Sequence, residues 1–88
     1  MAAASVEYKA SAASDLDRLD RAVALRVLKK IEKSLAEPGR AGEPLAGDFE
    51  GLLRLRVGDY RVIYARTSTG YLVLRIGHRG DVYRRGRP

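Results

Sequence analysis

The sequence lacks cysteine and has a single histidine among its 88 residues. The absence of cysteine excludes a disulfide framework, a thiol nucleophile and a cysteine-ligated zinc site. One histidine argues against a histidine-rich metal site, so we expect no metal and no other cofactor. No apolar run reaches the length of a membrane span, and MAAASVEYK at residues 1–9 lacks the charged-then-apolar pattern of a signal peptide. We therefore expect a cytoplasmic protein without a membrane partner.

Lysine is missing from the second part of the chain, where none follows Lys33. Residues 51–88 carry 9 arginines and 2 aspartates, whereas residues 1–50 carry 8 basic and 9 acidic residues. The net charge of +6 therefore resides in the second part, entirely as arginine. A basic surface attracts nucleic acid, anionic membranes or acidic proteins, and guanidinium groups favour planar recognition of phosphate or carboxylate.

The first half of the chain predicts one short strand and two helices. VEYKA (6–10) is a candidate strand, Ser11 is a candidate N-cap for a short helix to Leu19, and Asp20 can cap a longer helix to about Ala36. Apolar residues of the longer helix recur at three- and four-residue steps: Ala24, Val27, Leu28, Ile31 and Leu35. Its opposite side is basic, with Arg26, Lys29, Lys30 and Lys33. We interpret that stripe as a solvated face in preference to an RNA contact.

The second half predicts strands. EPGRAGEPLAG (37–47) has two prolines and three glycines and predicts a loop. After it come three strands and two turns: LLRLRV (52–57), the turn Gly58–Asp59, YRVIYAR (60–66), the turn TSTG (67–70) and YLVLRI (71–76). We expect a single α+β domain over 1–88, in which an N-terminal strand and a helical hairpin pack on a small, mainly antiparallel twisted β-sheet. Residues 1–5 and 84–88 are expected to be flexible.

The hairpin at Gly58–Asp59 places the arginines. A two-residue loop there puts one set of alternating side chains on a core face: Leu53, Leu55, Val57, Tyr60, Val62 and Tyr64. Arg54, Arg56 and Arg61 then project from the other face, with Arg56 directly opposite Arg61. Opposed like charges destabilise a sheet, so the cluster predicts an anion-binding site. The alternative is that these arginines pair with acids from the first half or lie in water. The strand at 71–76 is apolar on both faces, which leaves its register open.

Two segments, GEPLAGDFEGLLRLRVGDYRVIYAR (42–66) and IGHRGDVYR (76–84), resemble the RelE/ParE superfamily of toxins from toxin–antitoxin pairs, more closely its RelE branch. The resemblance covers nearly the whole chain and implies a RelE-like fold. RelE-type members are ribosome-dependent endoribonucleases that cut mRNA in the decoding site. ParE-type members share the fold, poison DNA gyrase and generally lack the ribonuclease residues. Either type implies a cognate antitoxin as partner, with ribosome and mRNA for the first and DNA gyrase for the second.

The resemblance also implies site residues. Arg54, Arg61 and Arg79 match basic positions of the nuclease pattern, and Tyr83 matches its terminal, base-contacting tyrosine. Leu52 stands where the RelE-type pattern has a lysine, which favours the gyrase alternative, and the Arg79-to-Tyr83 spacing is shorter than in that pattern. The residues expected to bind RNA phosphates are Arg54, Arg56, Arg61, Arg79, Arg84 and Arg85, and RRGRP (84–88) is read as a loose electrostatic tail.

RNA cleavage through the 2′-OH needs a base for the 2′ proton, cations beside the phosphate and an acid for the leaving 5′ oxygen. Arginine stays protonated and suits only the second role. We therefore expect His78 or Tyr83 to transfer protons, which completes the catalytic set of Arg54, Arg61, Arg79, His78 and Tyr83. The alternatives are a capping or surface role for His78 and a core-edge role for Tyr83. A third possibility for the whole chain is a non-toxic module that binds RNA or an acidic peptide.

Overall fold

The computed structural model describes residues 5–36 and 42–88. In chain order the elements are β1 (Ser5–Tyr8), α1 (Ala10–Asp17), α2 (Arg21–Leu35), β2 (Glu43–Pro44), a 3₁₀ turn η1 (Gly47–Phe49), β3 (Leu53–Val57), β4 (Tyr60–Arg66) and β5 (Gly70–His78). The strands form one sheet in the order β1-β5-β4-β3-β2. Only the β1–β5 pair is parallel among these neighbours, which confirms the predicted α+β class and mainly antiparallel sheet.

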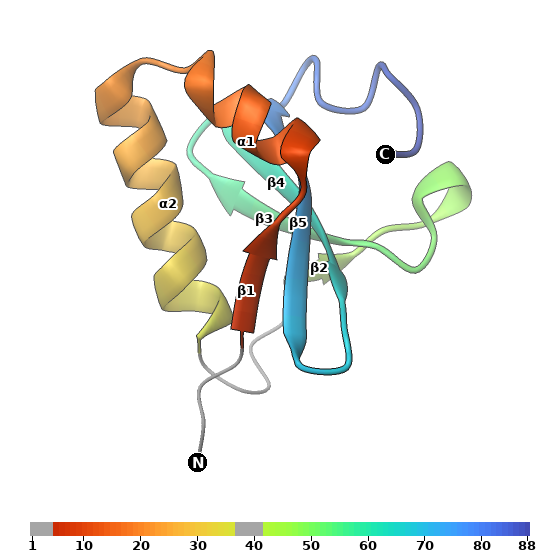
Figure 1. Cartoon of the computed structure of the whole chain (residues 1–88). Helices are drawn as coiled ribbons and strands as arrows, with labels where there is room; N and C mark the ends of the chain where they lie inside the picture. The colour runs from red at the N-terminus through yellow and green to blue at the C-terminus, as the bar shows by residue number, and fades with distance from the viewer. Residues whose placement is uncertain (1–4, 37–41) are drawn as a thin grey trace.

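The sheet separates two layers. Helices α1 and α2 cover one face, and η1 and the C-terminal segment lie on the other side (Figure 1). Ser5 already belongs to β1, and the flexibility expected for residues 1–4 concerns positions outside the described ones. Neither described helix combines the length and apolarity needed to cross a lipid bilayer.

Helix α2 follows its apolar pattern. Val27, Ile31 and Leu35 are fully buried against the sheet, because their spacing puts them on one side of the helix. Asp20 occupies the N-cap position, as predicted, and its carbonyl oxygen accepts the Ala24 N–H at 2.8 Å, although its side chain makes no capping hydrogen bond. The helix bounds predicted from the sequence are therefore right to within one residue at each end.

Helix α1 begins earlier than predicted, because Lys9 and not Ser11 occupies its N-cap position. The Ser11 hydroxyl instead donates to the Leu74 carbonyl at 2.8 Å, and the carboxylate of Asp15 accepts the Ile76 N–H at 3.0 Å. Both contacts join α1 to β5. The N-cap prediction was wrong because the hydroxyl has a partner on the sheet, which the local sequence does not reveal.

The predicted loop over 37–47 contains a strand. Within its described part, Glu43 pairs with Arg54 and Pro44 with Leu53, so β2 forms the edge of the sheet beside β3. Proline is compatible with an edge strand because its nitrogen has no hydrogen to donate to a ladder. A two-residue strand shows no alternation, which is why the pattern predicted only a loop.

The β3–β4 hairpin has the predicted register. Leu53 faces Tyr64, Leu55 faces Val62 and Val57 faces Tyr60, while Arg56 faces Arg61. The six alternating side chains all belong to the cluster beneath the helices: four are buried, and Leu55 and Tyr60 are partly buried. The core face is therefore confirmed.

The opposite face of the sheet carries a second, smaller apolar cluster. Its buried members are Leu52, Ile63, Leu74 and Val82, with Leu45, Phe49, Ala65, Leu72 and Tyr83 packed around them. Strand β5 is therefore covered on both faces, since Val73 and Ile76 belong to the helix-side cluster and Leu74 to the other. This explains why its sequence is apolar throughout and why its register could not be read from the pattern.

Candidate functional site

Three arginines gather on the sheet face that lacks helices. Alternation along β3 puts Arg54 and Arg56 on the same side, and the hairpin register puts Arg61 beside Arg56. This placement follows from the confirmed register, since neighbouring pairs in an antiparallel ladder alternate between the two faces. We call Arg54, Arg56 and Arg61 the arginine cluster.

The anion within this cluster belongs to the chain itself. Oε2 of Glu43 lies 2.8 Å from Nη2 of Arg54, and Oε1 lies 2.9 Å from Nε of Arg56. The hydrogen bond from Arg54 lowers the pKa of Glu43, and the positive charges of Arg54, Arg56 and Arg61 lower it further. The alternative that the arginines pair with acids of the first half thus holds for Arg54 and Arg56. Three cations against one carboxylate leave excess positive charge for a phosphate.

Gly42 lets β2 approach β3 closely enough for this ion pair. A Cβ at Gly42 would lie 2.1 Å from the Arg54 carbonyl oxygen and 2.8 Å from the Tyr64 hydroxyl, which itself accepts the Gly42 N–H. No side chain fits there without a shift of the backbone.

We expect Gly42→Ala to displace β2 from the sheet edge, at a cost of about 1–3 kcal/mol in the free energy of unfolding. Equilibrium urea denaturation measures this cost. Gly80→Ala is the matched control, because a Cβ there meets only Nδ1 of His78 at an ordinary 3.6 Å. Equal stability of the two variants would contradict the close-approach role of Gly42.

Tyr83 and Phe49 lie on the same side of the sheet as the arginine cluster. The Tyr83 hydroxyl accepts a hydrogen bond from Nη1 of Arg54 at 3.1 Å, and its ring meets the Phe49 ring edge-on at a centroid distance of 5.4 Å. The hydrogen bonds to Tyr83 and Glu43 raise the pKa of Arg54, so this side chain remains a cation. Arg54 therefore links the carboxylate of Glu43 to the hydroxyl of Tyr83. Neither Glu43 nor Phe49 was identified from the sequence.

Arg61 and Arg79 lie near the β3–β4 turn. Nη1 of Arg61 donates to the carbonyl oxygens of Gly58 and Tyr60, both at 2.8 Å. The backbone N–H of Arg79 donates to the Asp59 carbonyl at 2.8 Å, and its guanidinium Nε lies 3.9 Å from the Asp59 carboxylate in an exposed pair. The structure thus brings Arg79 to the end of the sheet that holds Arg56 and Arg61.

His78 lies on the other face of the sheet. It pairs in register with Tyr60, a member of the helix-side cluster, and the two rings meet edge-on at 5.8 Å. Its Nδ1 accepts the Gly80 N–H at 3.2 Å, which is the capping role given as the alternative. The prediction that His78 shares a site with Arg54 and Tyr83 is not supported by this placement.

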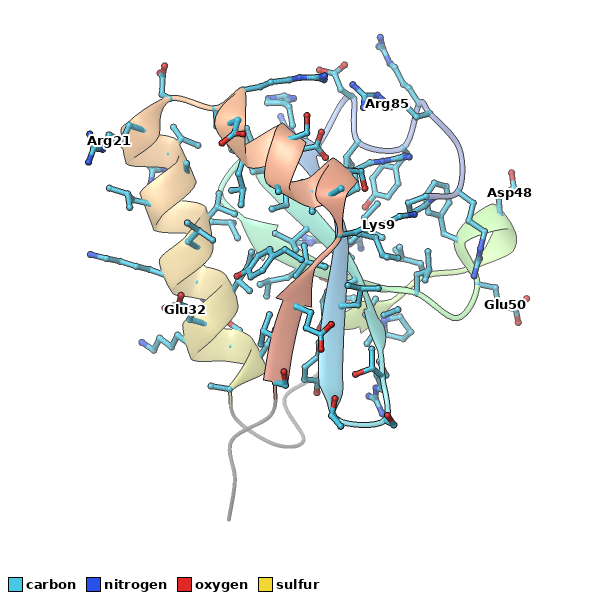
Figure 2. The ribbon with its side chains drawn as sticks, in the orientation of Figure 1. Lys9, Arg21, Glu32, Asp48, Glu50 and Arg85 are labelled. Atoms are coloured by element: carbon cyan, nitrogen blue, oxygen red, sulfur yellow. The ribbon has the colours of Figure 1, made fainter. Side chains whose placement is uncertain are left out.

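The last residues make contacts with several parts of the chain. Arg84 lies 3.7 Å from Asp81, and Arg85 lies 3.9 Å from Asp15 of α1, where Figure 2 shows it beside the helices. Nη1 of Arg87 donates to the carbonyl oxygens of Asp48 and Glu50 at 3.2 and 2.8 Å. The flexibility expected for 84–88 stays a prediction, and the structure adds that this segment contacts backbone carbonyls elsewhere in the chain, which sequence patterns do not report. No interaction joins Arg84 or Arg85 to Glu43 in the described chain.

Across residues 5–36 and 42–88, no three histidine or acidic side chains gather closely enough to hold a metal ion. Around Arg54, the described side chains supply the carboxylate of Glu43, the guanidinium groups of the arginine cluster and the phenol hydroxyl of Tyr83.

Comparisons with known proteins identify relatives of this chain. The profile of a family described as the ParE toxin of type II toxin-antitoxin system, parDE, matches residues 6–83. Two curated relatives from Mycobacterium tuberculosis are Toxin RelG, 33% identical over 92% of this chain and 97% of the relative, and Toxin RelE, 39% identical over 90% and 84%.

Solved structures extend the comparison. The toxin–antitoxin complex RelBE2 from M. tuberculosis has a chain that is similar with a TM-score of 0.78 and 29% identity, over 88% of this chain and 99% of that one. The RelB–RelE antitoxin–toxin complex from Methanococcus jannaschii has a TM-score of 0.65 at 17% identity, over 88% and 94%, and supports the fold alone.

Proposed function

This chain belongs to the RelE/ParE superfamily of toxins from type II toxin–antitoxin systems, and we propose that it is a ribosome-dependent endoribonuclease that cleaves mRNA in the decoding site. The first statement confirms the resemblance seen in the sequence. The second is favoured over gyrase poisoning because the curated relatives carry the names RelE and RelG. The RelBE2 toxin–antitoxin complex supports a cognate antitoxin as partner.

One observation carries the proposal: a carboxylate, three guanidinium groups and a phenol hydroxyl share the face around Arg54. These are an acceptor, a set of cations and a donor, which together are the groups that transesterification of RNA requires. In this scheme Glu43, which is not among the site residues picked from the sequence, takes a proton-transfer role for which His78 and Tyr83 were the two candidates.

The reaction follows from these contacts. Glu43 accepts the proton of a ribose 2′-OH, and the 2′ oxygen forms a bond to the adjacent phosphorus. Arg54, Arg56 and Arg61 stabilise the charge that builds on the phosphate oxygens. Tyr83 donates its hydroxyl proton to the departing 5′ oxygen, because its oxygen already accepts from Arg54 and its hydrogen remains available. The products are a 2′,3′-cyclic phosphate and a 5′-hydroxyl end.

The ionisation of Glu43 is directly measurable. We expect its carboxyl ¹³C signal to titrate below the ordinary range of glutamate, because Arg54 and the cluster favour the charged form. A lowered pKa means that the ion pair contributes fully above the ordinary glutamate pKa and is lost as the pH falls through the lowered value. Arg54→Gln should move the midpoint back upward. An unchanged midpoint in that variant would contradict the assignment of Arg54 as the main cause.

The test of the function is cleavage of mRNA bound to purified ribosomes, with the new 5′ ends mapped by primer extension. We expect cuts in phase with codons and little cleavage of the same RNA without ribosomes, since the ribosome positions the substrate. Tyr83→Phe should lower the rate by about 100-fold, the scale of general acid catalysis. His78→Ala, on the other face, should retain the rate within about threefold, as surface changes usually do.

DNA gyrase supplies the discriminating assay. Inhibition of supercoiling by the purified chain, with no codon-phased cuts in ribosome-bound mRNA, would replace the ribonuclease proposal by the ParE-type activity. Leu52 is the residue that raised that alternative, and it is now seen as 6% exposed in the apolar cluster beneath Tyr83 and Phe49. A lysine there would have to bury its charge or leave the cluster, so packing accounts for leucine at this position.

A further inference from the structure

Two arginines outside the arginine cluster each donate hydrogen bonds to backbone carbonyls that precede and follow an aromatic residue of the site. Nη1 of Arg75 donates to the carbonyl oxygens of Val82 and Gly86, at 3.1 and 2.8 Å, on either side of Tyr83. Nη1 of Arg87 donates to the carbonyl oxygens of Asp48 and Glu50, on either side of Phe49. The rings of these two aromatic residues are the ones that meet edge-on.

The backbone conformation at Gly86 brings Arg87 within reach of the carbonyls beside Phe49. Gly86 has φ of +72°, a left-handed conformation that lets the chain turn sharply after Tyr83. After that turn Arg87 reaches back to the η1 segment, which lies beside the C-terminal end in Figure 1. Figure 2 shows the labelled Asp48 and Glu50 on this segment, with their side chains directed outward, so Arg87 uses their backbone oxygens.

The apolar cluster alone does not fix the orientation of Tyr83. Val82 is 3% exposed and Tyr83 packs beside it on the cluster, and the backbone hydrogen bonds of this segment are local, such as those from Val82 to His78 and from Gly86 to Tyr83. These local bonds do not tie the segment to the sheet beyond Val82 and Tyr83, whereas Arg75 joins residues 82 and 86 directly to β5. Arg75 belongs to β5, and its half-buried side chain connects this central strand to the segment that carries Tyr83.

We propose that Arg75 and Arg87 are positioning residues that hold the Phe49–Tyr83 pair so that the Tyr83 hydroxyl meets Arg54. The catalytic role of this contact between Tyr83 and Arg54 rests on the proposed ribonuclease function. The structural role of Arg75 and Arg87 in holding the two rings does not depend on that function. Neither arginine contacts Glu43 in the described chain, and both act on the site through backbone carbonyls.

A double-mutant cycle tests the catalytic part. Arg75→Gln is expected to lower kcat for ribosome-bound mRNA about 10-fold, with KM within about twofold, because misplacement of a proton donor affects the chemical step. In a Tyr83→Phe background the same change should alter kcat less than about twofold, since the arginine acts through that hydroxyl. Arg75→Lys retains a donor for one carbonyl and should recover part of the rate. Arg66→Gln, an exposed arginine on β4, is the matched control and should leave kcat unchanged.

A second readout needs no RNA. The chain has one phenylalanine and five tyrosines, so the nuclear Overhauser contact between the Phe49 and Tyr83 rings is identified once the Tyr83 ring signals are assigned, for which the Tyr83→Phe variant serves. We expect it to weaken in Arg75→Gln and in Arg87→Gln, and to persist in Arg66→Gln. Arg87 lies at the surface of the C-terminal segment, so its variant keeps the core intact and remains measurable if Arg75→Gln fails to fold.

The outcomes are distinct. A retained ring contact in both variants, or full additivity of Arg75→Gln and Tyr83→Phe, overturns the positioning role. A wild-type chain that does not cut ribosome-bound mRNA overturns the proposed function. In that case the Overhauser contact between the two rings still tests whether Arg75 and Arg87 hold the Phe49–Tyr83 pair. Loss of the contact together with non-additive kinetics supports both.

Discussion

Replacing Arg54 by glutamine is expected to lower kcat/KM for cleavage of ribosome-bound mRNA by about 100- to 1000-fold, the scale seen when one preorganised donor is removed from a charge-stabilising site. Arg54 is the side chain that contacts both Glu43 and Tyr83, so its loss frees the carboxylate and the hydroxyl together. It also removes a cation from the phosphate site. The measurement is the initial rate of cleavage at saturating and at limiting ribosome–mRNA complex.

Two comparisons sharpen this prediction. Arg56→Gln should have a smaller effect, because the side chain of Arg56 is 58% exposed and its ion pair within the described residues is with Glu43, whereas the side chain of Arg54 is 23% exposed and also contacts Tyr83. Arg66→Gln removes an exposed arginine of β4 and should change the rate little. If all three variants lost the same activity, the general positive charge and not the Glu43–Arg54–Tyr83 contact would be responsible.

Ile31→Ala is expected to destabilise the protein by about 2–5 kcal/mol, the range for truncating a fully buried isoleucine. Ile31 is 0% exposed, at the centre of the buried stripe of α2, and belongs to the cluster with Val27 and Leu35. Its truncation leaves a cavity between the helix and the sheet. For a domain of this size such a loss is a large share of the total stability. Urea or thermal unfolding followed by circular dichroism measures it.

Leu25→Ala on the same helix is the matched control. Leu25 is 50% exposed, so little apolar contact is lost, and alanine has the higher helix propensity. We expect a change in the free energy of unfolding within about 0.5 kcal/mol. A comparable loss in both variants would contradict the assignment of the Ile31 loss to its packing between helix and sheet.

The β3–β4 hairpin was predictable because two local signals agree. Gly58–Asp59 sets a two-residue loop, and strict alternation on each side sets the faces, so the position of every arginine in the arginine cluster followed. Glu43 could not be found in this way. Its strand has two residues, its partner strand follows a turn, and the pairing depends on how closely Gly42 approaches the Arg54 backbone.

The C-terminal residues also show where sequence patterns fail to place side chains. His78 and Tyr83 are close in sequence and were grouped as one site, yet β5 ends at His78 on the helix side and the following turns carry Tyr83 to the other face. Face alternation applies only within a strand, so it says nothing about residues beyond its last pair. Hydrogen bonds from arginine to carbonyls, such as those of Arg75 and Arg87, depend on tertiary contact and leave no periodic trace.

The pairing of β1 with β5 affects how the chain folds. Val6 finds its strand partner at Tyr71, so the sheet edge joins the first and last strands of the described chain. Contacts between such distant residues slow folding, because the ordering of a long loop precedes the gain from the contact. During synthesis, the α1–α2 hairpin is made before the sheet that buries its apolar side. A nascent chain that ends before Gly70 therefore exposes Val27, Ile31 and Leu35 to chaperones and proteases. Such a chain also lacks Tyr83, the proposed proton donor.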